Sequence, residues 1–352
     1  MFGTLRFFLA TLVALSHAGV TLMGKYHLGV PAVVVFYILS GFVVTGMVHS
    51  WADAIQRAAS GSVSRVNWTT RPPSWRRFAR RFWAERVVRL YPPYAIALLL
   101  GLVAWSAGVA SGFLSKDTWW GQWVANITVL PLAFAPFVSS LNGLQLVPPA
   151  WSLGVEGMFY LLAPWLVLSP RALWGAALLS LVWQMAVHGA APWLGQWSDA
   201  LGYRLFPAAL LYFVMGAAVW LAFARDRRWW ALPLLGFVAQ SALLIVDGVR
   251  GLWGQPFLLE TSLGAVVGAP LVVALAQIPR RRWDARLGQL SYPIFLSHFP
   301  VLWLLGWEGK SLSLAMLLGY LALVLALAWV IDATAQQPLR SVRQQLLRTP
   351  SA

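Results

Sequence analysis

Apolar runs of about twenty residues recur along this chain, and they restrict its fold more than any other feature. A helix of that length matches the hydrocarbon core of a bilayer, roughly 30 Å thick. Because 59% of the residues are hydrophobic and only 11% are charged, a soluble domain, in which about a quarter would be charged, is excluded. The strands of a membrane β-barrel would instead alternate over about ten residues. The sequence therefore predicts an all-α integral membrane protein.

Breaks rich in charge, proline or glycine divide the chain into about ten predicted transmembrane helices. They cover residues 4–23, 29–49, 90–111, 150–168, 172–190, 204–223, 229–247, 257–277, 287–307 and 311–331. We expect residues 1–340 to form a single transmembrane domain and residues 341–352 a short cytoplasmic tail.

The distribution of basic residues predicts that both termini are cytoplasmic. In that orientation 21 of the 26 basic residues lie inside, as the positive-inside rule requires. The net charge of +15 is then explained by loop orientation and by anionic headgroups of the lipid bilayer, which is the expected partner. Binding of nucleic acid is not expected. The chain has no cysteine, which excludes a cysteine acyl-enzyme, and no histidine–carboxylate cluster has the spacing of a metal site.

The first span, Leu5–Met23, contains two ionisable residues, Arg6 and His17. Such residues are costly in hydrocarbon, so their default interpretation is functional. Their spacing is about three helical turns, which places them on one face about 16 Å apart. This arrangement suits an elongated ligand with an anionic end at Arg6 and a reactive end at His17.

The same stretch also resembles a signal peptide, with a small-x-small site at Ser16 and Ala18. Cleavage there would remove His17. We expect an uncleaved first span, because the next apolar run follows almost immediately.

The loop Trp51–Arg89 is rich in arginine and ends in Arg86 and Arg89, one helical turn apart. Two guanidinium groups on one helix face form a fork for phosphate. Snorkelling to lipid phosphates is an equally good interpretation. On the other side of the membrane, the Trp- and Pro-rich segment 112–150 is typical of an interfacial or re-entrant segment.

Glu156 and His298 are two further polar residues inside predicted spans. Glu156 is favoured as an active-site residue, with a polar lock between helices as the alternative. His298 precedes Phe299-Pro300, and the proline kinks the helix and frees a backbone carbonyl. Catalysis and a hydrogen bond to that freed carbonyl are equally good interpretations of His298.

The remaining ionisable residues of the spans are expected to be less informative. We expect three histidines to lie at the membrane interface, namely His27, His49 and His188. Three carboxylates are expected near the outer surface, namely Asp199, Asp247 and Glu260.

Taken in order, these stretches resemble the acyltransferase-3 family of bacterial multi-pass membrane acyltransferases. The resemblance covers most of the chain. It is carried by Arg6 with His17 after ten intervening residues, VVFYILSGF at 34–42, Arg86 with Arg89, Pro92 and Tyr94, WSLGVEGMFYLL at 151–162, and SYPIFLSHFPVL at 291–302.

The resemblance implies an acyl-CoA donor on the cytoplasmic side of a bacterial inner membrane, with acetyl-CoA expected. It implies an O-acyltransferase whose acceptor is a hydroxyl of a cell-surface or lipid-linked carbohydrate. The predicted donor-binding residues are Arg6, Arg86, Arg89 and Tyr94. The predicted catalytic residues are His17 as general base, with Glu156 and His298 in support.

The chain also departs from the family pattern at three positions. Val34 stands where the family often has Asp, Gly157 where it often has a larger or polar residue, and Ser297 where it commonly has Trp. These differences concern the acceptor side more than the transfer chemistry. The outer esterase-like domain of some relatives is absent, so we expect action alone or with a separate partner protein.

Two other functions are considered for the same residues. A transporter or flippase of a lipid-linked sugar would use His17, Glu156 and His298 as a proton relay, but the internal repeats typical of such folds are not found. A membrane scaffold would leave the ionisable residues of the spans unexplained. For the acyltransferase, direct transfer is favoured over an acyl-histidine relay, and the sequence leaves the oligomeric state open.

Overall fold

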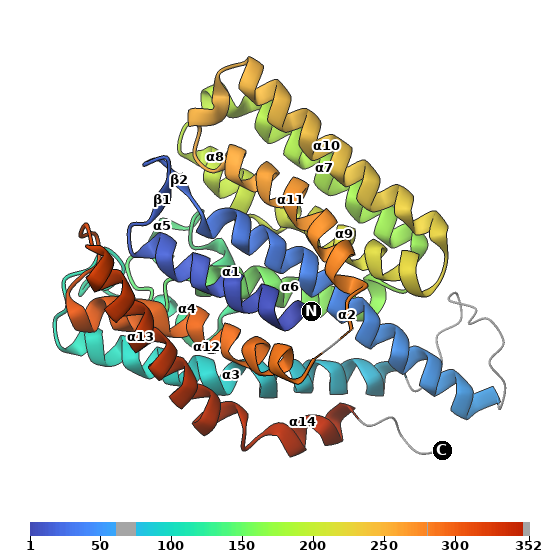
Figure 1. Ribbon diagram of the computed structural model, residues 1–352, viewed down its shortest axis with the longest axis horizontal. Helices are drawn as coiled ribbons and strands as arrows, with labels where there is room; N and C mark the ends of the chain where they lie inside the picture. The colour runs from blue at the N-terminus through green and yellow to red at the C-terminus, as the bar shows by residue number, and fades with distance from the viewer. Residues whose placement is uncertain (61–74, 280, 348–352) are drawn as a thin grey trace.

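The computed structural model describes residues 1–60, 75–279 and 281–347, which are predominantly helical (Figure 1). The longer helices are α1 (Phe2–His17), α2 (Gly29–Ser60), α3 (Trp75–Ser106), α6 (Ala150–Leu166), α7 (Pro170–Leu194), α9 (Phe206–Ala224), α10 (Ala231–Val249), α11 (Leu258–Ala276), α12 (Arg282–Leu305) and α13 (Leu314–Ile331). The shorter ones are α4 (Trp120–Thr128), η1 (Leu130–Phe134), α5 (Ser139–Asn142), α8 (Trp197–Asp199), η2 (Ala200–Arg204), η3 (Arg227–Trp230), η4 (Leu252–Gly254), η5 (Asp332–Gln336) and α14 (Arg340–Leu347). A small antiparallel hairpin, β1 (Thr21–Leu22) and β2 (Tyr26–His27), follows α1.

Within the described residues, seven helical segments are long and apolar enough to cross a bilayer, which confirms the predicted all-α membrane class. They are Gly29–Ala54, Trp75–Ser106, Pro170–Leu194, Trp197–Ala224, Arg227–Val249, Leu258–Ala276 and Leu314–Gln336. The three other predicted spans coincide with α1, α6 and α12. Helices α1 and α6 are shorter than these seven, and α12 carries charges in its first turns.

Helices α2 and α3 extend well beyond the predicted spans. Helix α2 continues past residue 49 to Ser60, and α3 begins at Trp75 rather than near residue 90. Arginine is a good helix former, so the helices need not end where the apolar run ends. The ring of Phe78 lies 5.3 Å from that of Trp51 and joins the two extensions. The predicted cytoplasmic residues Arg65, Arg71, Arg280 and Arg348 lie outside the described residues.

The segment between α3 and α6 folds as short helices stabilised by one buried amide. Asn126 donates hydrogen bonds to the carbonyls of Gln122 (2.9 Å) and Leu144 (2.8 Å) and accepts one from the Leu146 amide (2.8 Å). Proline interrupts this segment as predicted. Helix α4 ends at Thr128, and Pro131 lies in the first turn of η1, the short helix that comes next. The segment therefore forms a compact cover beside α3 and α6.

Helix α1 packs closely against α12 at the end where both helices begin. A Cβ atom at Gly3 would collide with the backbone carbonyl of Asp284, and one at Gly288 would lie 2.8 Å from the Cα of Gly3. Small residues of this kind allow the backbones of membrane helices to approach. The Asp284 carboxylate also accepts hydrogen bonds from the Thr4 amide and the Thr4 hydroxyl, both 2.8 Å. It thereby caps the N-terminus of α1.

Helices α2 and α9 make a second close contact through glycines. A Cβ atom at Gly41 would collide with the Phe213 carbonyl, and one at Gly216 would collide with the Ile38 carbonyl. Since α2 also packs against α1, this contact joins α9 to the packed pair of α1 and α2.

Two of the histidines that the sequence predicts at the membrane interface are buried within the protein. His49 is 2% exposed and donates to the Val167 carbonyl (3.1 Å). His188 donates to Asp247 (2.5 Å), and both side chains are buried. Asp247 and Glu260, both predicted near the outer surface, are buried as well. Glu260 accepts a hydrogen bond from the His27 amide (3.3 Å). The position of these residues relative to the membrane stays a prediction. The sequence did not indicate their burial, because their partners lie in segments far away in the chain.

Candidate active site

The packing of α1 on α12 brings together the two histidines singled out in the sequence. The rings of His17 and His298 lie with centroids 5.0 Å apart, and the ring of Phe299 lies 4.9 Å from that of His17. His17 is the last residue of α1, whereas His298 lies inside α12.

The hydrogen bond of His17 determines which ring nitrogen is available. Its Nδ1 lies 2.9 Å from the Val13 carbonyl oxygen. A carbonyl only accepts, so Nδ1 carries the proton, and in the neutral ring Nε2 keeps its lone pair. The His17 side chain is exposed to a cavity of about 520 Å³, the histidine cavity, which Ser152, Arg204 and Phe295 also line.

His298 lies behind His17 and is fully buried. Among the residues that the structure describes, neither of its ring nitrogens has a hydrogen-bond partner. The predicted alternative, a hydrogen bond to the carbonyl freed by Pro300, is therefore wrong. Its ring packs against those of His17, Phe295 and Phe299.

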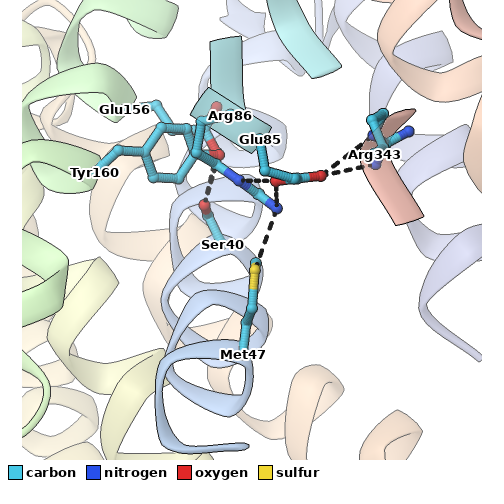
Figure 2. Close-up of polar contacts among 7 residues, drawn as sticks. All are labelled: Ser40, Met47, Glu85, Arg86, Glu156, Tyr160 and Arg343. Atoms are coloured by element: carbon cyan, nitrogen blue, oxygen red, sulfur yellow. Dashed lines mark hydrogen bonds and ion pairs between the residues drawn. The ribbon is translucent and has the colours of Figure 1, made fainter. Parts of the chain in front are cut away.

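Glu156 lies in a separate, smaller cavity. The carboxylate accepts hydrogen bonds from the hydroxyls of Ser40 (2.6 Å) and Tyr160 (2.5 Å), which approach from α2 and from the next turn of α6 (Figure 2). It therefore locks α6 to α2. Its hydrogen bonds do not include His17, whose Nδ1 is already bonded to Val13.

Arg86 is buried and paired with its neighbour Glu85. The Arg86 Nε donates to Glu85 (2.6 Å), and a terminal nitrogen lies 3.6 Å from the sulfur of Met47 (Figure 2). Arg86 is 5% exposed, so its guanidinium group does not reach lipid headgroups as the snorkelling interpretation requires. Glu85 also binds Arg343 of α14 (3.1 Å).

Arg6 and Arg89 line two adjoining cavities. With Arg86 and Glu156 they line the central cavity, of about 100 Å³. With Arg343 they line a larger one of about 680 Å³, which we call the arginine cavity. Arg89 makes no hydrogen bond or ion pair with any residue in the described part of the chain. Its guanidinium group is therefore available to an anion.

The three cavities adjoin one another in order from Arg6 to His17. The arginine cavity and the central cavity share Arg6, Arg89 and Tyr292. The central cavity and the histidine cavity share Val33, Ser152 and Phe295. The residues named here are therefore walls that neighbouring cavities have in common.

Tyr94 lines a fourth cavity, which adjoins the central one. Its hydroxyl donates to the Asn126 carbonyl (2.6 Å), and the side chain is 1% exposed. It lines an apolar cavity of about 210 Å³ between α3 and α6, together with Gly157 and Leu161. Arg86 lines both this cavity and the central one. The hydrogen bond of Tyr94 holds α3 against the cover segment, and its predicted role in donor binding stays a prediction.

Sequence reasoning missed several residues of the site. Tyr160 follows Glu156 by one helical turn, so the spacing alone could have indicated the pair. Ser40 lies in the quoted motif VVFYILSGF without being singled out. Arg343 lies in the predicted tail, where no pattern distinguishes it from the other arginines.

This fold and these cavities define a multi-pass membrane protein with a row of adjoining cavities, lined by arginines at one end and by a histidine at the other. The comparisons specify the class. The acyltransferase domain that defines the acyltransferase-3 family matches residues 3–333. The chain belongs to the acyltransferase-3 family and is a membrane acyltransferase, which favours group transfer over the transporter alternative.

One relative and the solved structures complete the comparison. An uncharacterized protein of Aquifex aeolicus (strain VF5) is 30% identical over 209 residues, which are 57% of this chain and 91% of the relative. No solved structure matches the chain.

Proposed function

We propose that the protein transfers an acyl group, with acetyl expected, from acyl-CoA to a hydroxyl of a cell-surface or lipid-linked carbohydrate. The observation that carries this proposal is the series of cavities from Arg6 to His17. The two residues are separated by about 16 Å of helix. A phosphate-bearing carrier with a long arm and a reactive thioester fits that arrangement.

The donor is anchored through charge. Arg6, Arg86 and Arg89 line the central cavity, and guanidinium groups bind phosphate through charge-assisted hydrogen bonds. Arg89 supplies the available group, while Arg86 is held by Glu85. The arm then passes Glu156 and Ser152 towards the histidine cavity.

His17 is the general base. Its Nε2 takes the proton of the acceptor hydroxyl as the hydroxyl oxygen attacks the thioester carbonyl carbon. The carbon–sulfur bond then breaks, and the thiolate leaves and takes up the proton from the imidazolium, giving coenzyme A and an ester. Direct transfer of this kind needs no acyl-enzyme.

His298 and Glu156 act as positioning residues in this proposal. His298 packs on the ring of His17 and fixes its orientation. Glu156 holds α6 against α2 through Ser40 and so maintains the width of the central cavity.

We also propose the topology expected from the sequence. The seven apolar segments together with α1, α6 and α12 cross a bacterial inner membrane as one domain of residues 1–340. Both termini are then cytoplasmic, and the donor enters the arginine cavity from the cytoplasm. His17 lies towards the outer face, where a carbohydrate acceptor would meet it.

Mass spectrometry of surface glycans and lipids tests this function directly. Cells with and without the gene should differ by an acetyl-sized mass on one carbohydrate species, and reintroduction of the gene should restore it. Accumulation of an unmodified lipid-linked precursor inside the cell would instead support transport and contradict the proposal.

A further inference from the structure

The C-terminal helix α14 is attached to the wall of the arginine cavity. It packs against α3, and Figure 1 shows the two helices side by side. Its Arg343 donates through Nε (3.2 Å) and Nη2 (3.1 Å) to one oxygen of Glu85, as Figure 2 shows. Glu85 is completely buried, so this attachment is not a surface ion pair.

Arg343 also faces the cavity itself. It lines the arginine cavity together with Arg6 and Arg89. The acidic residue in that lining is Asp284, and its carboxylate is already engaged by Thr4. The lining is therefore strongly cationic, and a cavity of about 680 Å³ falls in the range that small-molecule ligands occupy.

The geometry of Arg343 leaves part of its guanidinium group unused. Nε and Nη2 are bonded to Glu85, whereas Nη1 makes no hydrogen bond within the described residues. Glu85 is at the same time bonded to Arg86. The buried carboxylate thus holds two arginines in place, one beside the central cavity and one beside the arginine cavity.

We propose that Arg343 is a donor-binding residue that contacts the phosphate-bearing nucleotide end of acyl-CoA in the arginine cavity. The inference rests on the proposed function, because it takes acyl-CoA as the donor. It adds a residue beyond the segment that matches the family, which ends at 333. Helix α14 is then a wall of the donor site rather than a tail.

Binding measurements on the full chain in lipid nanodiscs test this assignment. Arg343→Ala should weaken the binding of coenzyme A about tenfold or more, the loss expected for a hydrogen bond to a charged group. Adenosine 3′,5′-bisphosphate, which represents only the nucleotide end, should lose affinity to a similar extent. Pantetheine, which lacks the phosphates, should bind the variant and the natural protein equally.

Arg340→Ala is the matched control. Arg340 lies on the same helix and contacts Gln289 (2.7 Å) and Asp332 (3.6 Å), but it does not line the arginine cavity. Its loss should leave the binding of coenzyme A unchanged. Arg343→Lys, which keeps the charge, should recover part of the affinity if the ligand is a phosphate.

Three outcomes would overturn the assignment. Equal losses with coenzyme A and pantetheine would mean that Arg343 only supports the fold. Unchanged binding of coenzyme A together with loss of co-purified anionic lipid would assign the cavity to a lipid headgroup. If the natural protein does not bind coenzyme A, the cavity is not a coenzyme A site and Arg343 is not a donor-binding residue. Binding with the expected losses but no transfer to any carbohydrate would contradict only the proposed function.

Discussion

The imidazole rings of His17 and His298 lie 5.0 Å apart, although they come from opposite ends of the chain. His17 faces a cavity and its Nε2 makes no hydrogen bond within the described residues, where neither ring nitrogen of the buried His298 has a partner. The two rings therefore cannot have the same role, and their variants should behave differently.

His17→Ala should abolish transfer while the protein remains folded and inserted. Removal of a general base costs about 10²- to 10⁴-fold in rate. Within the described residues, the hydrogen bond of this ring is local, to Val13, so its loss should not unfold the protein. Acylation in membranes should be measured beside size-exclusion chromatography of the solubilised protein. Near-normal acylation would exclude His17 as the base.

His298→Leu should lower kcat about tenfold or more and at the same time raise the melting temperature. An apolar side chain removes two buried nitrogens without partners, each of which costs about 1–3 kcal/mol. The KM for the donor should not change, because His298 lines none of the donor cavities. Full activity in a stabilised variant would show that the residue only fills space.

Arg89→Ala and Arg86→Ala should separate donor binding from stability. Arg89→Ala should raise the donor KM about tenfold or more with normal expression, because Arg89 has no ion pair in the described part of the chain. Arg86→Ala leaves the buried Glu85 with Arg343 and should also destabilise the protein, by up to about 3–5 kcal/mol. Donor titrations and thermal unfolding distinguish the two. An unchanged donor KM in Arg89→Ala would exclude donor binding by Arg89 and favour the alternative, contact with lipid phosphates.

Asp284→Ala should loosen the start of α1 and cost about 1–3 kcal/mol. Burial opposes ionisation of this carboxyl, but its hydrogen bonds from Thr4 favour the charged form and hold the pKa of Asp284 below its ordinary value. The stabilisation is thus present above an ordinary pKa of about 3.9 and is lost as the pH falls through the lower folded value. Thermal unfolding across pH in detergent measures this, and Asp284→Asn, which keeps an acceptor, should be milder.

Gly216→Ala should destabilise the protein strongly, because its Cβ would collide with the Ile38 carbonyl. The matched control is Gly175→Ala, at an open position of α7 where a Cβ meets nothing within 4 Å. There the gain in helix propensity, about 1 kcal/mol, should appear as equal or higher stability. Equal behaviour of both variants would contradict the close packing of α2 on α9.

The helical membrane class followed from the sequence because hydrocarbon imposes it locally. A long apolar run must satisfy its own backbone hydrogen bonds, and a helix does so within the segment. The placement of Arg6 and His17 on one face was equally local, since the helical period fixes it. The ends of α2 and α3 were predicted less well, because arginine ends an apolar run without ending a helix.

The partners of the buried polar groups were decided only by the tertiary structure. Glu156 meets Ser40, Glu85 meets Arg343, and His188 meets Asp247, each across helices far apart in the chain. The periodicity of residues within one helix does not say how that helix is rotated against its neighbour. That rotation is set by close contacts such as Gly3 against Asp284. The sequence alone determined which residues are costly in a membrane, and the packing of the helices determined what each of them binds.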